Sequence, residues 1–148
     1  MKLHSFMFSP GKWLGEGKIC LNMVEEELTF FTRWTVRQEE DGIIECVQEI
    51  QVKGVSEIMM NYFRIYNRQP LSFSLFMENH AIGKIEGTGM IKDSIVGWEF
   101  RVEELGFEGF ECYERQEDNT YLMQAEFATV DQLRTSIQGR IWKQTPVS

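Results

Sequence analysis

Apolar and polar residues alternate with a period of two along much of this chain. In one stretch, Leu28, Phe30 and Trp34 fall on one face, whereas Arg33 and Arg37 fall on the other. Side chains on a β-strand alternate between two faces in the same way, so this spacing is typical of a strand that is buried on one side. The pattern therefore predicts a chain built mainly of β-strands.

Turn-forming segments divide the chain into about ten such stretches, at the spacing typical of an all-β meander. The stretches cover residues 13–23, 28–36, 43–52, 58–66, 71–77, 82–92, 95–102, 107–113, 121–130 and 133–143. Residues 55–66 also fit a helix, because their apolar positions have helical spacing, but their β-branched and aromatic residues favour a strand. A short helix near residues 3–9 is the other helical candidate.

Closure of the sheet is the simplest way to accommodate these strands. Consecutive strands in an open sheet leave two unpaired edges, and a barrel removes both, whereas a two-layer sandwich with a dry core is the competing architecture. Polar and apolar residues share faces here, since Gln48 lies with Ile50 and Arg64 with Tyr62. Polar groups on an inner face suit a barrel with a wet cavity. We expect an all-β fold, an antiparallel up-and-down meander of about ten strands closed into a barrel.

Length and charge narrow the classes of function. A chain of 148 residues fits one domain, which we take as residues 1–148. The 15 basic and 23 acidic residues give a net charge of −8, so a phosphate backbone or an anionic membrane surface would repel the chain. No apolar run reaches the ~18 residues of a membrane span, and the first ten residues lack the pattern of a secretory signal. We expect a cytoplasmic protein that binds no nucleic acid and inserts into no membrane.

Metal-binding and nucleophile motifs are absent from the sequence. Cys20, Cys46 and Cys112 are widely separated and form no paired motif, which we interpret as buried free thiols in a reducing compartment. The two histidines, His4 and His80, leave no zinc ligand set and little choice of catalytic base. We therefore predict no metal site, no cofactor and no catalytic residue.

Acidic residues are numerous, but they do not mark a catalytic pair. Acid–base catalysis by two carboxylates needs groups with different pKa values. Glu108, Glu111, Glu114 and Glu117 fall within or beside a predicted strand, and other acidic runs fall at predicted turns. We interpret these side chains as solvated surface charge.

A Gly-x-Trp motif opens the first predicted strand at Gly11 and Trp13, and a basic residue, Arg140, lies on the last strand. In this order the two elements resemble the ends of the calycin superfamily, which includes lipocalins, fatty-acid-binding proteins and nitrobindin-like barrels. The resemblance implies a calycin-like barrel with a structural end formed by these three residues, in which Trp13 plugs the barrel and Arg140 packs on its ring. Arg134 is the alternative basic partner.

Shorter stretches resemble individual branches of that superfamily. Residues 11–17 resemble the Gly-x-Trp-x-Gly-x-Gly opening of nitrobindin-like barrels, which bind haem through a histidine on the final strand. Residues 133–143 contain no histidine, so we expect no haem. Residues 140–142 resemble the Arg-x-Tyr of fatty-acid-binding proteins, which holds a ligand carboxylate, with tryptophan in place of the tyrosine. Residues 9–13 and 133–137 are similar to the ends of S-type phycobilin lyases.

Together these features predict a non-catalytic barrel that binds a small, largely apolar ligand. Ligands that bear a carboxylate fall within this prediction. The candidate ligand-binding residues are aromatic or basic residues of the predicted strands: Trp34, Tyr62, Arg64, Trp98, Arg134, Arg140 and Trp142. A buried guanidinium needs an anionic partner, and both a ligand carboxylate and a neighbouring glutamate stay open.

Two other functions stay open at this point. One is a lyase-like protein that handles a tetrapyrrole, suggested by the similarity of residues 133–137. The other is an interaction module with a filled barrel, which forms a homodimer through an apolar patch at Trp98, Phe100, Phe107 and Phe110.

Overall fold

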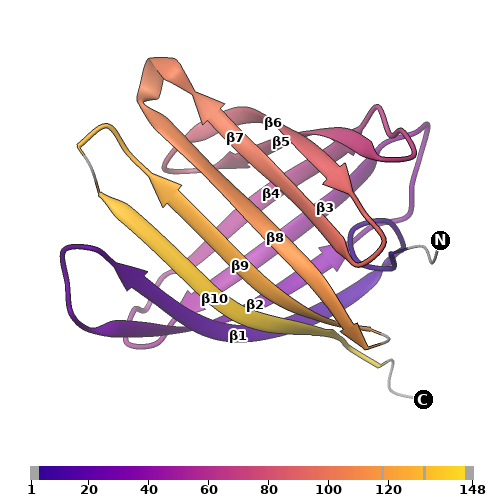
Figure 1. Cartoon of the computed structure of the whole chain (residues 1–148). Coiled ribbons are helices and arrows are strands. Elements are labelled where there is room, and N and C mark those ends of the chain that lie inside the picture. The colour runs from indigo at the N-terminus through magenta and orange to yellow at the C-terminus, as the bar shows by residue number, and fades with distance from the viewer. Residues whose placement is uncertain (1–3, 118, 132, 146–148) are drawn as a thin grey trace.

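Every stretch predicted to be a strand forms one, and each strand pairs antiparallel with the next strand along the chain (Figure 1). The computed structural model describes residues 4–117, 119–131 and 133–145. The strands are β1 (Gly11–Leu21), β2 (Glu27–Val36), β3 (Ile44–Val52), β4 (Ile58–Tyr66), β5 (Ser72–Asn79), β6 (Gly83–Ile91), β7 (Ile95–Val102), β8 (Phe107–Glu117), β9 (Thr120–Ala128) and β10 (Arg134–Lys143). A 3₁₀ turn, η1 (Glu103–Leu105), precedes β8. Within the described residues no helix is long and apolar enough to cross a membrane.

The last strand, β10, returns to pair with β1 and closes the sheet into a barrel. The register of this pair runs from Trp13 opposite Lys143 to Leu21 opposite Thr135. Every described strand therefore has two neighbours, which rules out the sandwich. The predicted closed antiparallel meander is confirmed, and the stretch that also fitted a helix forms β4.

The chain before β1 folds across one end of the barrel, on the right of Figure 1. Its described part forms turns instead of the short helix expected near residues 3–9. The backbone N–H of Ser9 donates to the carbonyl of Ser5 over 3.2 Å. Met7 has a positive φ of 73°, a conformation that ends regular helix. The expected helix is therefore wrong over residues 4–9.

This segment places Phe6 at the centre of an aromatic cluster. The side chain is fully buried. Its ring centroid lies 4.7–5.6 Å from the rings of Trp13, Trp34, Tyr113 and Tyr121. Edge-on and tilted contacts at these distances are favourable for aromatic rings. Residues 4–10 therefore plug the barrel, and we call this end the closed end.

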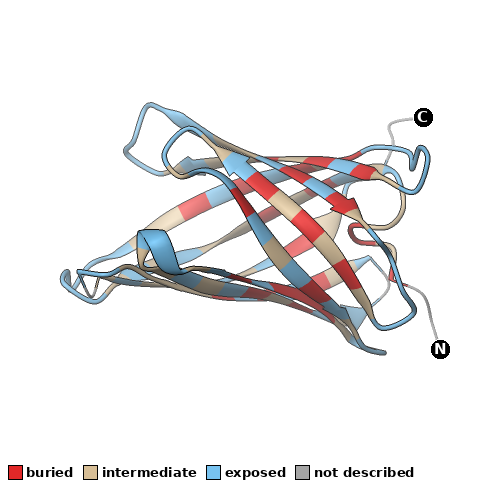
Figure 2. Cartoon of the chain, turned by 90° about the horizontal axis from the view of Figure 1, so that it is seen from above, coloured by how far each residue is buried: buried red, intermediate tan, exposed pale blue. Residues whose placement is uncertain are grey.

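The opposite end carries the β1–β2, β7–β8 and β9–β10 connections, on the left of Figure 1. The inward-facing apolar residues near it are only partly buried: Ile19, Ile50, Val52, Val102, Phe107, Phe127 and Ile137. Figure 2 shows the same contrast. Buried segments gather in the half of the barrel that lies near the two chain termini, and the opposite end is mostly intermediate or exposed. Solvent therefore reaches the inner wall at this end, which we call the open end.

Inward-facing glycines let aromatic rings approach the barrel wall. A Cβ at Gly89 would lie 2.1 Å from the ring of Phe73, and a Cβ at Gly17 would lie 2.8 Å from the ring of Phe30. Both distances are shorter than any van der Waals contact. A glycine covered by a neighbouring ring is a device that curves a sheet without leaving a hole.

The closed-end plug predicts a large effect on stability. Replacing Phe6 with alanine removes a buried ring and leaves a cavity, so we expect the free energy of unfolding to fall by about 3–5 kcal/mol. Chemical denaturation followed by tryptophan fluorescence measures this change. Phe31→Ala is the control, because Phe31 lies on the outer wall and is 49% exposed; its cost should stay below about 1 kcal/mol. Equal costs for the two variants would contradict a plug at Phe6.

Candidate functional site

The barrel wall divides the predicted ligand-binding residues into two groups. Trp34 on β2 and Trp98 on β7 face inward and are buried, with ring centroids 6.2 Å apart. Trp98 stacks on Tyr113 at 5.3 Å. Phe63 packs between the two tryptophans, 5.0 Å from Trp34 and 5.7 Å from Trp98. These two predicted residues therefore meet inside the barrel.

The other five predicted residues lie on the outer wall: Tyr62, Arg64, Arg134, Arg140 and Trp142. On β4 the buried positions are Phe63 and Ile65, whose side chains point the opposite way from Tyr62 and Arg64. The interpretation that Arg64 belongs to an inner face is therefore wrong. A ligand inside the barrel would not contact these five side chains.

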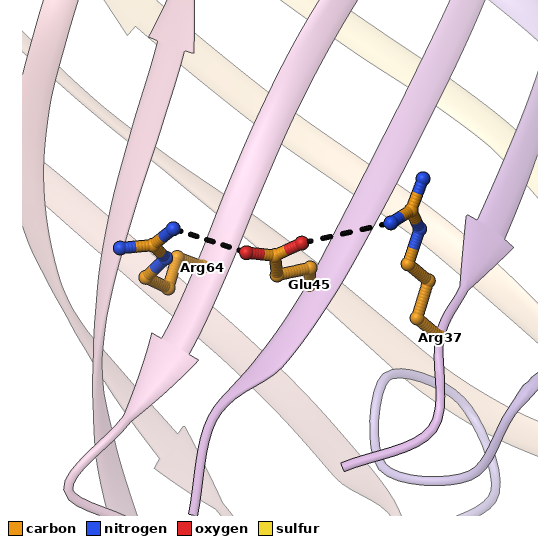
Figure 3. Close-up of polar contacts among 3 residues, drawn as sticks. All are labelled: Arg37, Glu45 and Arg64. Atoms are coloured by element: carbon orange, nitrogen blue, oxygen red, sulfur yellow. Dashed lines mark hydrogen bonds and ion pairs between the residues drawn. The ribbon is translucent and has the colours of Figure 1, made fainter. Parts of the chain in front are cut away.

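Glutamates partner two of the outward-facing arginines. An oxygen of Glu45 accepts a hydrogen bond from Arg64 at 3.0 Å, and its other oxygen lies 3.9 Å from Arg37 (Figure 3). Glu16 lies 3.2 Å from Arg140. The sequence left open whether an arginine pairs with a ligand carboxylate or with a neighbouring glutamate. For Arg64 and Arg140 the structure shows a glutamate. Such exposed pairs stabilise a protein by only about 0–1 kcal/mol.

The end expected from Gly11, Trp13 and Arg140 forms in a different way. Gly11 begins β1, and Trp13 is buried at the closed end. Arg140 lies on the other face of the wall, with its guanidinium 5.2 Å from the centre of the Trp142 ring. The expected contact between Arg140 and Trp13 is therefore wrong. Phe6 covers Trp13 instead, with ring centroids 5.3 Å apart.

Depressions on the outer wall collect some of the outward-facing residues. Tyr62 and Arg64 line one of 320 Å³. Arg140 lines a wider one of 970 Å³ together with Cys20 and Cys112. A role of these residues in ligand binding stays a prediction, and it would be a role on the outer wall.

The three cysteines differ in exposure. Cys46 is buried, and burial raises the pKa of its thiol to about 12. Cys112 is partly buried, and burial again raises its pKa. Cys20 is exposed, so the interpretation of all three as buried thiols is wrong for this residue. Raised pKa values keep the first two thiols protonated and therefore weakly nucleophilic at neutral pH.

Glu111 is the acidic residue that the sequence interpretation missed. It faces inward from β8 and is only 7% exposed, rather than solvated as expected. Its carboxyl group accepts hydrogen bonds from the indole N–H of Trp98 at 3.1 Å and from the hydroxyl of Tyr113 at 2.9 Å. Burial raises the pKa of Glu111 to about 7, although these two donors oppose the shift. The barrel therefore holds a carboxyl group that titrates near neutrality.

A second group of polar side chains crosses the inner wall from β2 to β5. Hydrogen bonds link four of these side chains one after another, and we call them the polar row: Thr32, Gln48, Asn61 and Asn79. Gln48 donates to the hydroxyl of Thr32 at 3.2 Å, Asn61 donates to Gln48 at 3.1 Å, and Asn79 donates to Asn61 at 3.0 Å. Thr32 and Gln48 are buried, whereas the two asparagines are partly buried and lie nearer the open end.

Polar groups at the closed end tie the plug to the barrel. The Nε2–H of His4 donates to the carbonyl of Lys92 at 2.6 Å, and Nδ1 accepts from the hydroxyl of Tyr121 at 2.8 Å. Burial lowers the pKa of His4, which fits this neutral ring. His80 is exposed beyond β5. Across the described residues, no three His, Cys, Asp or Glu side chains gather in a way that could hold a metal ion.

Comparison with known proteins now adds to this geometry. No family model and no curated protein matches the chain. The S-type phycobiliprotein lyase CPES from Guillardia theta has a similar structure, with a TM-score of 0.71 at 8% identity over 94% of this chain and 90% of that one. Rv2717c from M. tuberculosis has a TM-score of 0.72 at 9% identity over 92% of each chain. The likeness to these two structures is one of fold, a closed antiparallel β-barrel.

A further neighbour in shape is EF1p2_mFAP2b, whose structure was determined bound to DFHBI. It has a TM-score of 0.52 at 10% identity, over 91% of this chain and 93% of that one. At identities this low, the likeness to all three structures is one of fold.

The raised pKa of Glu111 predicts a pH dependence of stability. The folded barrel holds this proton more tightly than the unfolded chain, so its stabilising effect is complete below pH 4.5 and is lost as the pH rises through about 7. Relative to Glu111→Gln, the wild-type free energy of unfolding should fall by about 3 kcal/mol over this range. Denaturation curves from pH 4.5 to 8 measure the difference. Glu108→Gln, an exposed neighbour on β8, is the control and should follow the wild type. Identical slopes for wild type and Glu111→Gln would contradict a buried, protonated Glu111.

Proposed function

We propose that the inner wall of the open end binds a small, largely apolar ligand without catalysing a reaction on it. The observation that carries this proposal is the difference between the two ends of one inner face. Near the closed end, inward-facing side chains are buried against each other and the plug. Near the open end, apolar side chains such as Val102 and Ile137 remain partly exposed to solvent.

Apolar area left in contact with water is a source of affinity. Covering it with a ligand contributes about 25 cal/mol per Å² of apolar surface removed from water. The partly buried aliphatic and aromatic residues at the open end come from the adjacent strands β7, β8, β9, β10 and β1, and from β3. A ligand between them would touch several walls at once, which is the usual arrangement in a small-molecule site.

The structural neighbours add support of a general kind. One of them is described with DFHBI bound, and another is described as an S-type phycobiliprotein lyase. These two neighbours support the general point that a barrel of this shape can act on or bind a small molecule. A tetrapyrrole-handling function remains the second candidate, and it rests on this likeness of fold.

The interaction-module alternative loses part of its basis. Trp98 and Phe100 are 2% exposed and face the interior, so they cannot contribute to an outer apolar patch as expected from the sequence. Phe107 also faces inward and is partly buried, whereas Phe110 lies on the outer wall with 37% of its side chain exposed. A homodimer stays a prediction, and its contact would have to use other outer-wall residues.

Blocking the open end tests the proposed function. We expect Nile red, a neutral apolar dye, to bind the wild-type barrel saturably, with energy transfer from the buried tryptophans as the signal. Ile137→Trp fills the inner wall and should weaken binding at least about tenfold, the equivalent of 1.4 kcal/mol. Gln138→Trp is the matched control, because the next residue on β10 faces outward and is exposed; its affinity should equal that of the wild type.

Two results would count against a site inside the open end. One is the absence of saturable Nile red binding to the wild type. The other is an equal loss of binding in the two tryptophan variants, which would place the dye on the outer wall.

A further inference from the structure

The polar row has a fixed hydrogen-bond direction, which begins at Asn79. Its Oδ1 accepts hydrogen bonds from the backbone N–H groups of Ala81 at 3.0 Å and Ile82 at 2.7 Å. A backbone N–H can only donate, so the oxygen of this amide has to face the turn. The two backbone donors therefore determine which atom of the Asn79 amide is the oxygen and which is the nitrogen.

The rest of the row follows from this first orientation. The NH₂ group of Asn79 faces Asn61, which has to present its oxygen, and the NH₂ group of Asn61 then faces the oxygen of Gln48. Gln48 in turn donates to the hydroxyl of Thr32, and that hydroxyl donates to the backbone carbonyl of Glu49 at 2.9 Å. Every amide oxygen of the row accepts at least one hydrogen bond.

One N–H donor near the open end is left over. Each amide has two N–H groups. Asn79 directs its NH₂ group at the sulfur of Met77 as well, 3.7 Å away, and Gln48 is covered, with only 2% of its side chain exposed. Asn61 is partly buried, and the hydrogen bond that its NH₂ group donates among the described residues goes to Gln48, which leaves its second N–H facing solvent. A donor that a ligand would cover needs an acceptor from that ligand, because an unpaired buried donor is costly.

We propose that Asn61 donates this N–H to a neutral carbonyl oxygen on the ligand, so that the open end selects apolar molecules that carry a carbonyl-type acceptor. This inference rests on the proposed function. Gln48 and Asn79 act as positioning residues, since they hold the amide of Asn61 in one orientation. The sequence interpretation did not include Asn61 among the binding residues.

The charge of the inner wall explains why the acceptor is neutral. Among the described residues that face inward in the open half of the barrel, none is lysine or arginine. The arginines predicted to hold a ligand carboxylate lie on the outer wall. The acidic group inside is Glu111. A buried carboxylate without a cation is strongly disfavoured, whereas a carbonyl needs only a hydrogen-bond donor.

Three naphthalene probes that differ at one substituent test this selectivity. They are 2-acetylnaphthalene with a carbonyl, 2-ethylnaphthalene without one, and 2-naphthoate with a carboxylate, each used to displace Nile red at pH 7. The ratio of acetyl to ethyl affinity should be about five- to tenfold higher in the wild type than in Asn61→Leu, the effect of one neutral hydrogen bond. Naphthoate should bind the wild type more weakly than the acetyl probe. Met60→Leu, at the outward-facing position just before Asn61 on β4, is the control and should keep the wild-type ratio.

A second measurement reports the hydrogen bond directly. The infrared stretch of 2-acetylnaphthalene labelled with ¹³C at the carbonyl should move to lower frequency in the wild-type complex, and back toward its value in an apolar solvent in Asn61→Leu. This shift does not depend on how tightly either variant binds. The affinity of 2-ethylnaphthalene, which has no carbonyl, shows in the same samples that the variant barrel is folded and open.

The outcomes separate the two proposals. If Nile red binds saturably but the acetyl-to-ethyl ratio is the same in wild type and Asn61→Leu, or naphthoate binds best, the role of Asn61 is overturned and the apolar site stands. If neither Nile red nor any naphthalene probe binds the wild type, the proposed function fails, and the inference fails with it.

Discussion

The pairing of β1 with β10 is the constraint on which the rest of this structure depends. Closure joins the first and last strands in one register, Trp13 opposite Lys143 and Leu21 opposite Thr135. Because side chains alternate along a strand, a register fixed at one seam decides which half of the residues lies inside. A slip of β10 by one residue would place Gln138 or Arg140 opposite Gly17, so that an outward-facing side chain would have to turn inward. The closed barrel therefore depends on this seam.

One inner face serves two purposes along the axis of the barrel. At the closed end, Phe6 and the four rings around it are buried against one another, which gives the barrel a packed aromatic core. At the open end, inward-facing residues such as Val102 and Ile137 keep contact with solvent. The packed half maintains the shape, whereas the open half leaves inner-wall residues accessible to the ligand that we propose.

The sequence predicted the strands because alternation depends on local spacing, and it predicted the closure because an open sheet of these strands would leave two unpaired edges. Alternation with a period of two, interrupted by turns, survives even where individual residues are unusual. The assignment of faces was harder, because outer-wall residues such as Phe31 and Tyr62 are apolar and obscure the alternation. Arg64 was placed on the wrong face for this reason: its neighbours at alternate positions, Met60 and Tyr62, look like core residues.

The two residues that the sequence interpretation missed show what a single chain can reveal. Asn61 alternates with Phe63 and Ile65, so the pattern on β4 held a signal for a polar residue on the inner face. Glu111 had no such signal, since Glu108 and Glu114 lie close to it on the same strand and point outward. Its burial follows from the register with Trp98, a contact between strands that spacing along one strand cannot show.

The inward-facing polar groups of the polar row and Glu111 are uncharged below about pH 7. Amides and a hydroxyl make up the polar row, and burial keeps the carboxyl group of Glu111 protonated up to about pH 7. The same low-polarity surroundings that raise this pKa would oppose the burial of a charged ligand. Arg64 and Arg140 on the outer wall are paired with glutamates in water, where little is gained or lost. Amides and a protonated carboxyl group on the inner wall support the neutral guest that we propose, and the raised pKa of Glu111 and the amide of Asn61 belong to the same low-polarity surroundings.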